Sequence, residues 1–254
     1  MVYFVGAGPG DVELITVKGA RLLKEADIIV YAGSLVNPEL LTLAKPGAEI
    51  YDSASMTLEE VLAVLIRGSR QGKLVVRLHT GDPSLYGAIQ EQLDRLREEG
   101  IVAEIVPGVS SAFAAAAAIQ RELTLPGISQ TVIFTRLGGR TPVPEKESLA
   151  GLAGHQATMA IFLSVGRIDQ VVAELLAGGY APETPAAVVQ KASWPGEVKV
   201  QGTLATIARQ VREQGITKTA VILVGEAVGA KDYARSRLYD AAFSHGFREG
   251  KGCG

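Results

Sequence analysis

The sequence of 254 residues contains a single cysteine and only three histidines. The cysteine, Cys253, stands in a glycine-rich C-terminal stretch, so an intramolecular disulfide and a cysteine-based metal cluster are both excluded. The histidines, His79, His155 and His245, share no spacing that is typical of metal ligands. We therefore expect no protein-bound metal ion.

Long apolar runs and an excess of one charge are also missing. No run approaches the roughly 20 residues that a membrane span needs, so we expect no membrane association. The chain starts with a strand-like run at residues 2–5 and shows no basic segment followed by a cleavage site, which predicts a cytoplasmic protein without a secretory signal. The 25 basic and 27 acidic residues nearly cancel, and the basic ones are dispersed, which argues against a nucleic-acid partner.

Glycine and apolar residues, by contrast, are abundant, with 29 glycines and a hydrophobic content of 47%. This composition suffices for one large α/β domain or two smaller ones. Strand-like and helix-like segments alternate along the chain, which is typical of a parallel sheet with crossover helices. The periodicity breaks around residues 123–127. We therefore predict an N-terminal α/β domain over residues 1–122, a C-terminal α/β domain over 123–229 and a tail over 230–254.

The expected strands cover residues 2–5, 27–31, 73–78, 101–106, 131–135, 158–163, 186–189, 198–200 and 220–224. The expected helices cover residues 14–26, 85–96, 112–119, 168–176 and 204–211, with a further helix that begins at the capping box of Thr57 and Glu60.

The stretch of residues 77–88, Arg-Leu-His-Thr-Gly-Asp-Pro-Ser-Leu-Tyr-Gly-Ala, lies between an expected strand and an expected helix. Its Gly81 and Asp82 would stand at the carboxyl end of a buried strand, where open α/β sheets bind small ligands. A structural alternative is that Asp82 caps the helix and Pro83 is its first residue. His79 is more typical of a hydrogen-bonded strand residue than of a site residue.

A glycine-rich turn, Gly-Ala-Gly-Pro-Gly at residues 6–10, follows the first strand. It resembles a dinucleotide-binding fingerprint, but its last interval is one residue short and Pro9 removes an amide donor. A carboxylate that binds a ribose would be expected at the end of the second strand, where residues 31–33 are Tyr-Ala-Gly. Asp27 precedes that strand and would lie at the opposite edge of the sheet. The turn alone does not distinguish a structural glycine turn from a ligand-binding loop.

Three motifs in this order resemble the tetrapyrrole (class III) family of S-adenosylmethionine-dependent methyltransferases. They are Gly-Ala-Gly-Pro-Gly-Asp at 6–11, Gly-Asp-Pro-Ser-Leu-Tyr-Gly at 81–87 and Val-Pro-Gly-Val-Ser-Ser at 106–111. The resemblance covers nearly the whole chain. Further segments are similar to the subgroup that methylates carbon 11 of precorrin-4 in corrin synthesis, namely residues 31–36, 121–126, 135–136, 139–142 and 235–240.

This resemblance implies two α/β domains with S-adenosylmethionine folded into the cleft between them. It also implies methyl transfer to carbon 11 of precorrin-4, or of its cobalt form, by a homodimer that releases S-adenosylhomocysteine. The chemistry requires mainly alignment and exclusion of water, so we name no catalytic residue. The alternatives are methylation of another ring carbon, an NAD-dependent oxidoreductase and a non-catalytic nucleotide-binding module.

The resemblance also implies a set of cofactor-binding residues. Carried over motif by motif, they are Pro9, Gly81, Asp82, Leu85, Ser110, Ser111, Leu163, Ala192 and Thr219, with Ala220 as an alternative to Thr219. Leu163 stands where the family often has methionine. Without the resemblance, Leu85 and Leu163 would be assigned to the core and Ser110 to a helix cap.

The tetrapyrrole substrate carries many carboxylates, so its site should offer hydrogen-bond donors and positive charge. The candidates are Arg136 and Arg140, on the loop that follows the second domain's first strand, and Lys191 beside Ala192. For each of them an ordinary solvated surface charge is the alternative, and for Lys191 it is the favoured one.

Overall fold

The structure, a computed structural model, describes residues 1–33, 35–139 and 141–250 and divides into two compact units. Unit 1 comprises residues 1–118 together with 189–198, and unit 2 comprises residues 119–188 and the chain from Lys199 on. The first crossing, after Ala118, falls close to the boundary that we placed after residue 122. The sequence pattern gave no indication that a short later segment belongs to unit 1.

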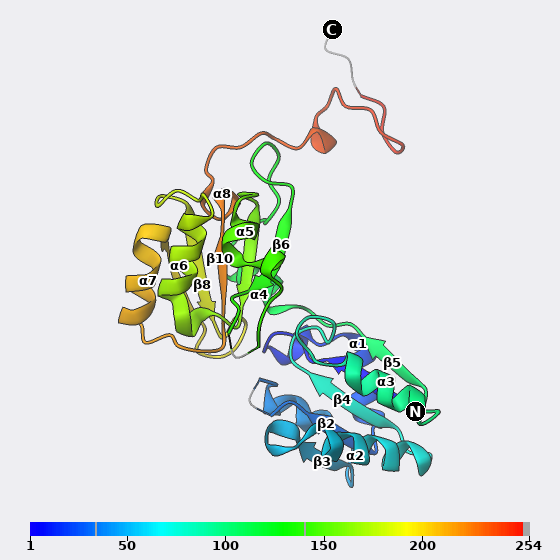
Figure 1. The fold of residues 1–254 in the computed structure, drawn as a ribbon. Helices are drawn as coiled ribbons and strands as arrows, with labels where there is room; N and C mark the ends of the chain where they lie inside the picture. The colour runs from blue at the N-terminus through cyan, green and yellow to red at the C-terminus, as the bar shows by residue number, and fades with distance from the viewer. Residues whose placement is uncertain (34, 140, 251–254) are drawn as a thin grey trace. The chain divides into compact units, whose positions relative to one another are not determined.

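Unit 1 contains a five-stranded sheet in the order β3-β2-β4-β1-β5, in which every neighbouring pair is parallel (Figure 1). Its strands are β1 (Val2–Gly6), β2 (Ile28–Tyr31), β3 (Glu49–Asp52), β4 (Val75–His79) and β5 (Ala103–Val106). Its α-helices are α1 (Val17–Glu25), α2 (Leu58–Arg70), α3 (Gln90–Glu98) and α4 (Ser111–Ala118). The expected parallel sheet is confirmed for this unit, so the carboxyl ends of all five strands lie at one edge.

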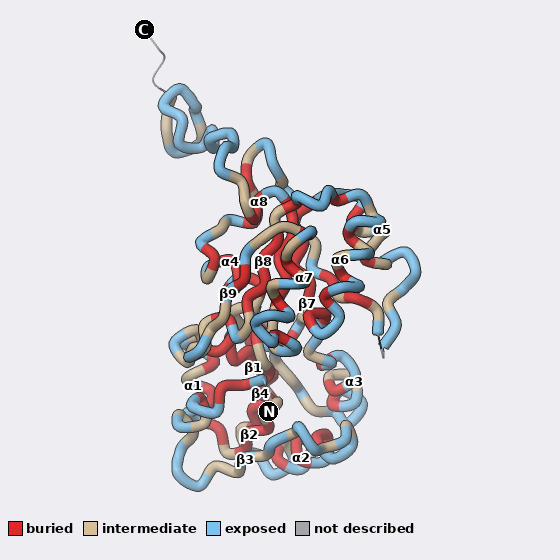
Figure 2. The backbone as a smooth tube through the Cα atoms, turned by 90° about the vertical axis from the view of Figure 1, so that its left-hand side faces the viewer, coloured by how far each residue is buried: buried red, intermediate tan, exposed pale blue. Residues whose placement is uncertain are grey.

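Both faces of the first sheet are buried by helices. Because successive strand residues point to opposite faces, Phe4 and Val5 of β1 belong to different apolar clusters. The Phe4 cluster includes residues of α2 and α3, whereas the Val5 cluster includes Leu22 and Leu23 of α1. Figure 2 shows the resulting concentration of buried residues on β1, β2 and β4.

Two helix starts test the expected signals directly. The capping box at the start of α2 is confirmed, since Glu60 N donates to Thr57 Oγ1 at 3.3 Å and Thr57 N donates to Glu60 Oε2 at 2.7 Å. Helix α3 starts at Gln90 rather than at residue 85. Tyr86 and Ala88 have positive φ angles of 58° and 48°, and this left-handed backbone cannot continue a helix. The alternative in which Asp82 caps this helix is therefore wrong.

Unit 2 contains a second five-stranded sheet in the order β6-β7-β10-β8-β9. Its strands are β6 (Val132–Arg136), β7 (Thr158–Phe162), β8 (Pro185–Gln190), β9 (Val198–Thr203) and β10 (Ala220–Val224). Its α-helices are α5 (Leu149–Ala153), α6 (Ile168–Ala177), α7 (Leu204–Glu213) and α8 (Glu226–Gly229). Short 3₁₀ helices cover Val12–Leu14, Pro38–Leu43, Ser53–Ser55, Glu145–Glu147, Val165–Arg167 and Arg237–Tyr239.

The second sheet is mixed, so the expected parallel arrangement is wrong there. Strands β6 and β7 are parallel, but β7 and β10 run antiparallel. Both β7 and β10 are buried, and a buried strand has the same apolar pattern whichever way its neighbour runs. The direction of pairing could not be derived from that pattern.

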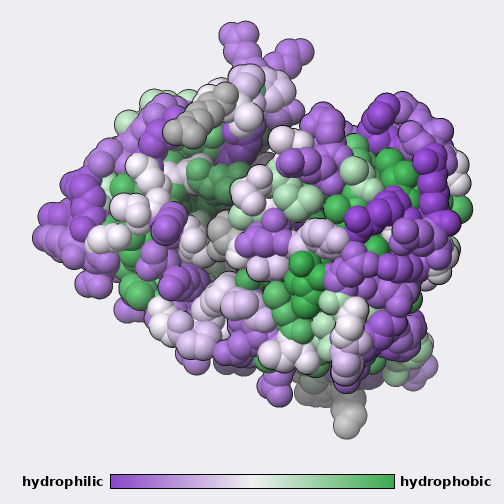
Figure 3. Space-filling model, turned by 90° about the horizontal axis from the view of Figure 1, so that it is seen from below, coloured by the Kyte–Doolittle hydropathy of each residue, from purple (hydrophilic) through white to green (hydrophobic). Residues whose placement is uncertain are grey.

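The outer surface is mixed in character. Figure 3 shows one face on which hydrophilic residues predominate and hydrophobic residues gather in separate patches. Among the described residues, no helix combines the length and the apolar character that crossing a bilayer requires.

Candidate functional site

Three turns meet at the carboxyl edge of the first sheet, which is where ligands bind in open α/β folds. They follow β1, β4 and β5, and β1 lies between the other two strands. Gly81 N donates to Gly8 O at 2.8 Å and Gly8 N donates to Gly81 O at 3.3 Å, so the first two turns form a bridge. Ala7 N also donates to His79 O at 2.7 Å. The glycine-rich turn and the stretch of residues 77–88 therefore form one local structure.

The contacts among these turns are made by main chain and require glycine. A Cβ atom on Gly108 would lie 2.2 Å from Gly81 O, and one on Gly6 would lie 2.6 Å from the Cα atom of Gly108. Gly8 and Gly81 also have positive φ angles of 78° and 59°. Because no side chain separates the turns, their backbones pack directly against one another.

The Asp82 carboxylate joins the second turn to the third. Its Oδ2 accepts a hydrogen bond from Gly108 N at 2.8 Å, and its Oδ1 accepts from Ser84 N at 2.9 Å and from Ser84 Oγ at 2.5 Å. Partial burial raises the pKa of Asp82, but the hydrogen bonds from Ser84 and Gly108 together outweigh it and lower the pKa below its usual value. The carboxylate is thus held ionised and oriented.

The serine pair and Leu85 lie beside this junction. A Cβ atom on Gly81 would be 3.8 Å from Ser111 N and 3.9 Å from the Cα atom of Ser110. Ser110 is buried and its Oγ accepts from Ala112 N at 3.3 Å, so it caps α4, as the structural alternative predicted. Leu85 is partly buried, and its N–H donates to Asp82 O at 3.3 Å. The structure thus brings Gly81, Asp82, Leu85 and both serines together.

Pro9 is held by residues that the sequence analysis missed. Its carbonyl accepts a hydrogen bond from Trp194 Nε1 at 2.8 Å, and the carbonyl of Gly10 accepts from Asn37 Nδ2 at 2.8 Å. Trp194 belongs to the segment 189–198 of unit 1, which also contains the buried Ala192. The available signal was that Trp194 is the only tryptophan in the chain, within a short segment of turn-forming residues.

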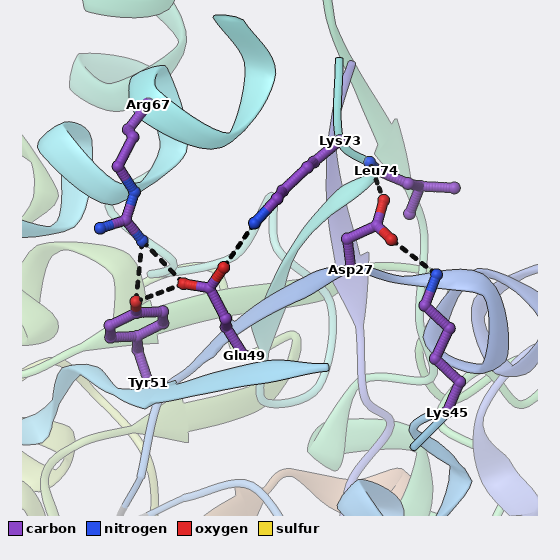
Figure 4. A network of polar contacts seen from close by, with 7 residues as sticks. All are labelled: Asp27, Lys45, Glu49, Tyr51, Arg67, Lys73 and Leu74. Atoms are coloured by element: carbon purple, nitrogen blue, oxygen red, sulfur yellow. Dashed lines mark hydrogen bonds and ion pairs between the residues drawn. The ribbon is translucent and has the colours of Figure 1, made fainter. Parts of the chain in front are cut away.

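The amino edge of the same sheet has a different character, which Figure 4 shows. Asp27, at the start of β2, accepts from Leu74 N at 2.7 Å and from Lys45 Nζ at 2.6 Å. The hydrogen bond from Lys45, and after it the one from Leu74 N, lowers the pKa of Asp27. Nearby, Glu49 forms ion pairs with Arg67 and Lys73. The expectation that Asp27 lies at the edge opposite the turns that follow β1, β4 and β5 is confirmed.

A carboxylate does reach the carboxyl edge, but from β3, a strand that we did not predict. Burial and the neighbouring, hydrogen-bonded Asp52 raise the pKa of Tyr31. A Cβ atom on Gly33 would lie 1.9 Å from Asp52 Oδ1, so glycine is needed there for the carboxylate to keep its position. Ser53 Oγ donates to Tyr31 O at 2.9 Å. The expectation of an edge without a carboxylate was based on the end of β2 alone and is incomplete, because Asp52 at the end of β3 lies beside Tyr31.

In unit 2, Leu163 and Thr219 come to one edge of the second sheet. The antiparallel register pairs Ile222 with Ile161, so its continuation places Leu163 opposite Ala220, the neighbour of Thr219. Leu163 and Thr219 both have a φ angle of 55°, a conformation that non-glycine residues rarely adopt outside functional or constrained sites. Leu163 is 70% exposed, so the alternative that assigned it to the core is wrong.

The three candidate cations differ in what the structure shows. Arg136 pairs with Phe162 in the parallel register and so lies at the same edge as Leu163. Its guanidinium donates to the carbonyls of Thr141 at 3.0 Å and Pro142 at 2.8 Å, which shapes the loop that follows β6. Lys191 is exposed and has a φ angle of 49°. Arg140 lies outside the described residues.

Comparisons with known proteins agree with this geometry. The family model described as Tetrapyrrole (Corrin/Porphyrin) Methylases matches residues 1–208. Cobalt-precorrin-4 C(11)-methyltransferase of Methanocaldococcus jannaschii is 60% identical over 98% of this chain and 96% of its own length.

Two solved structures are also similar. A cobalt precorrin-4 methyltransferase superposes with a TM-score of 0.88 at 51% identity, covering 90% of this chain and 96% of its own. Uroporphyrin-III C-methyl transferase of Thermus thermophilus, in complex with S-adenyl homocysteine, gives a TM-score of 0.75 at 34% identity, covering 90% of this chain and 93% of its own. On these matches, which extend along most of both units, the chain belongs to the family of tetrapyrrole (corrin/porphyrin) methylases.

Proposed function

We propose that this protein transfers the methyl group of S-adenosylmethionine to carbon 11 of precorrin-4, with or without bound cobalt. The observation that carries the proposal is the 60% identity to a cobalt-precorrin-4 C(11)-methyltransferase over 98% of this chain. A solved cobalt precorrin-4 methyltransferase, which is 51% identical, has the same fold at a TM-score of 0.88. Other ring carbons are less well supported, because the uroporphyrin-III enzyme is only 34% identical.

The turns of unit 1 fit the methyl donor. The contacts among Gly6, Gly81 and Gly108 bring main chain from three segments together at this edge, so a methyl donor bound beside them would meet main chain. The Asp82 carboxylate, held by Gly108 N, keeps the turns in register. We assign cofactor binding to Pro9, Gly81, Asp82, Leu85, Ser110, Ser111 and Ala192 of unit 1 and to Leu163 and Thr219 of unit 2.

The residues of the chain have to align and shield the reactants rather than to activate a nucleophile. When bound, S-adenosylmethionine supplies an activated methyl group whose carbon–sulfur bond breaks, with a neutral thioether leaving, as the bond to the ring carbon forms. Main-chain turns locked by glycine contacts are suited to this task because they hold a ligand in a single orientation. Arg136 and Lys191 supply positive charge for the substrate's carboxylates in this proposal.

We further infer that the protein acts as a homodimer in the cytoplasm. The dimer is an inference from the family resemblance, and the location is an inference from the similarity to enzymes of precorrin methylation. Size-exclusion chromatography with light scattering tests the dimer, since a monomer mass across micromolar concentrations would contradict it.

Calorimetry and product analysis test the function in sequence. S-adenosylhomocysteine should bind and NAD should not, whereas binding of NAD alone would indicate an oxidoreductase. Incubation with S-adenosylmethionine and precorrin-4 should add the mass of one methyl group, and carbon NMR should locate it at carbon 11. A methyl group at another carbon would correct the position, and no added mass despite binding would indicate a non-catalytic module.

A further inference from the structure

We propose that Trp194 is a positioning residue that sets the orientation of the glycine-rich turn and thereby the affinity for the methyl donor. The inference rests on the proposed function, because it assumes that this turn holds S-adenosylmethionine. Nothing in the motifs of the first half of the chain points to Trp194, which follows the turn by 185 residues.

Two side chains of the β8–β9 loop hold the turn from outside. Trp194 Nε1 donates to Pro9 O at 2.8 Å, and Asp11 N donates to Ser193 Oγ at 3.0 Å. A trans peptide is planar, with its C=O and N–H groups pointing in opposite directions. The hydrogen bond from Trp194 therefore determines the direction of the N–H group of Gly10 as well as that of the Pro9 carbonyl.

The indole packs directly on the turn. A Cβ atom on Gly10 would lie 1.9 Å from Cδ1 and 2.1 Å from Nε1 of Trp194. Any other residue at position 10 would therefore displace the ring. Asn37 Nδ2 donates to Gly10 O at 2.8 Å, which adds a further constraint from another element. The third glycine of the turn thus makes room for Trp194, which explains the short Gly-Pro-Gly interval.

The loop itself is held in an unfavourable conformation. Lys191, Ser193 and Gly196 have φ angles of 49°, 68° and 83°. Ser193 N donates to Glu197 Oε2 at 2.8 Å, and Trp194 N donates to Lys191 O at 2.9 Å. Left-handed conformations of non-glycine residues persist where the surroundings enforce them, which is common at ligand sites.

Ala192 links the loop to the cofactor. It is buried, it is one of the residues assigned to cofactor binding, and it lies two positions before Trp194. The same short loop thus carries a cofactor contact and the hydrogen bond to the turn. Binding of the donor should therefore change the surroundings of the indole.

The test compares Trp194→Phe with Tyr180→Phe. The first substitution keeps an aromatic ring but removes the donor to Pro9 O. The second removes a comparable ring-to-backbone hydrogen bond, from Tyr180 to Ala157 O in unit 2. In calorimetry, Trp194→Phe should weaken S-adenosylhomocysteine binding roughly three- to tenfold, the effect of one lost hydrogen bond, and Tyr180→Phe should leave it within twofold. In steady state, Trp194→Phe should raise KM for S-adenosylmethionine with little change in kcat.

A second measurement needs no variant. Trp194 is the only tryptophan, so the fluorescence of the unmodified protein should change on titration with S-adenosylhomocysteine, with the dissociation constant found by calorimetry. The inference is overturned if the unmodified protein binds this ligand but its emission stays constant, or if folded Trp194→Phe binds it equally well. If the unmodified protein binds no S-adenosylhomocysteine, the proposed function itself fails.

Discussion

At the scale of single residues, one carboxylate connects two of the three turns. Asp82 accepts hydrogen bonds from Gly108 N in one turn and from Ser84 N in its own. A carboxylate that accepts backbone N–H groups in this way favours its ionised form and restricts the backbone. The role of Asp82 is therefore to keep the turns after β4 and β5 in a fixed relation.

Replacing Asp82 by alanine should weaken S-adenosylhomocysteine binding about tenfold, because Gly108 N loses its partner and the two turns can separate. Isothermal titration calorimetry measures the change. Asp94→Ala is the matched control, since Asp94 is a carboxylate of α3 that pairs with Gln90 and Arg97. Unchanged affinity in Asp82→Ala would remove this residue from the site.

His79, close to the same turn, is buried with its ring stacked on Phe4 at 5.9 Å. Burial, together with the charge of Arg77, lowers the pKa of His79 from 6.5 to about 3. Its Nε2 has no hydrogen-bond partner among the described residues. The expected strand histidine is confirmed as buried, but it is not fully hydrogen-bonded.

This depressed pKa makes stability depend on pH. Between about pH 6.5 and 3 the unfolded chain binds a proton at His79 that the folded chain does not. The contribution of His79 to the free energy of unfolding is therefore fully present above pH 6.5 and decreases as the pH falls towards 3. The contribution lost between pH 7 and pH 5 is about 2 kcal/mol. Urea unfolding at both pH values should show this loss, and His79→Phe should reduce it.

The exposed His155 provides the control. The variant His155→Gln should show the same decrease in the free energy of unfolding between pH 7 and pH 5 as the unmodified protein. Histidine NMR signals give a direct check that does not depend on a variant. A His79 ring that titrates near pH 6.5 in the folded protein would contradict the expectation.

At the scale of elements, the site depends on how closely the turns after parallel strands approach one another. Gly6, Gly81 and Gly108 come from three different turns or strand ends, and their main chains are in contact. Such contacts allow little adjustment, because backbone atoms cannot change rotamer as side chains do.

Gly108→Ala should therefore disturb both stability and binding. Its Cβ atom would lie 2.2 Å from Gly81 O, which forces the two turns apart. We expect a loss of about 1–3 kcal/mol in the free energy of unfolding, typical of overpacking, together with weaker S-adenosylhomocysteine binding. Gly246→Ala, where an added Cβ meets open space, should change stability by less than about 0.5 kcal/mol. If both variants had the same free energy of unfolding and the same affinity for S-adenosylhomocysteine, the close contact between Gly108 and Gly81 would be unimportant for either property.

The elements also show what could be predicted from sequence. Signals that act over a few residues were reliable, such as the capping box of Thr57 and Glu60. The start of α3 was missed because Tyr86 and Ala88 adopt left-handed conformations that tertiary contacts impose. The antiparallel pairing of β7 and β10 was missed because both strands are buried.

For the site, the family resemblance indicated that the residues around Pro9, Gly81 and Ser110 belong together. The turns that carry them do lie in contact, because parallel strands share one carboxyl edge. Asp52 was not predicted to lie at this edge, because its strand β3 was not recognised in the sequence. Trp194 stands out as the only tryptophan, but its role was missed because its contact with Pro9 joins positions 185 residues apart. No local pattern encodes a contact of that range.

At the scale of the whole molecule, the chain passes between its two compact units three times. After Ala118 it enters unit 2, it returns to unit 1 for residues 189–198, and it enters unit 2 again at Lys199. The returning segment includes the last residues of β8 and the first residue of β9, both strands of the second sheet. Neither unit therefore consists of one continuous piece of chain.

This connectivity predicts that the two units unfold together. The β8–β9 loop is bound to unit 1 through Trp194 and Ser193, while its flanking strands belong to the sheet of unit 2. Loss of either unit removes the support of that loop. Urea unfolding followed by Trp194 fluorescence, which reports on unit 1, should therefore coincide with unfolding followed by far-UV circular dichroism, which reports on both. A fluorescence transition at clearly lower urea, with most of the dichroism retained, would show instead that unit 1 unfolds independently and that the loop is only weakly held.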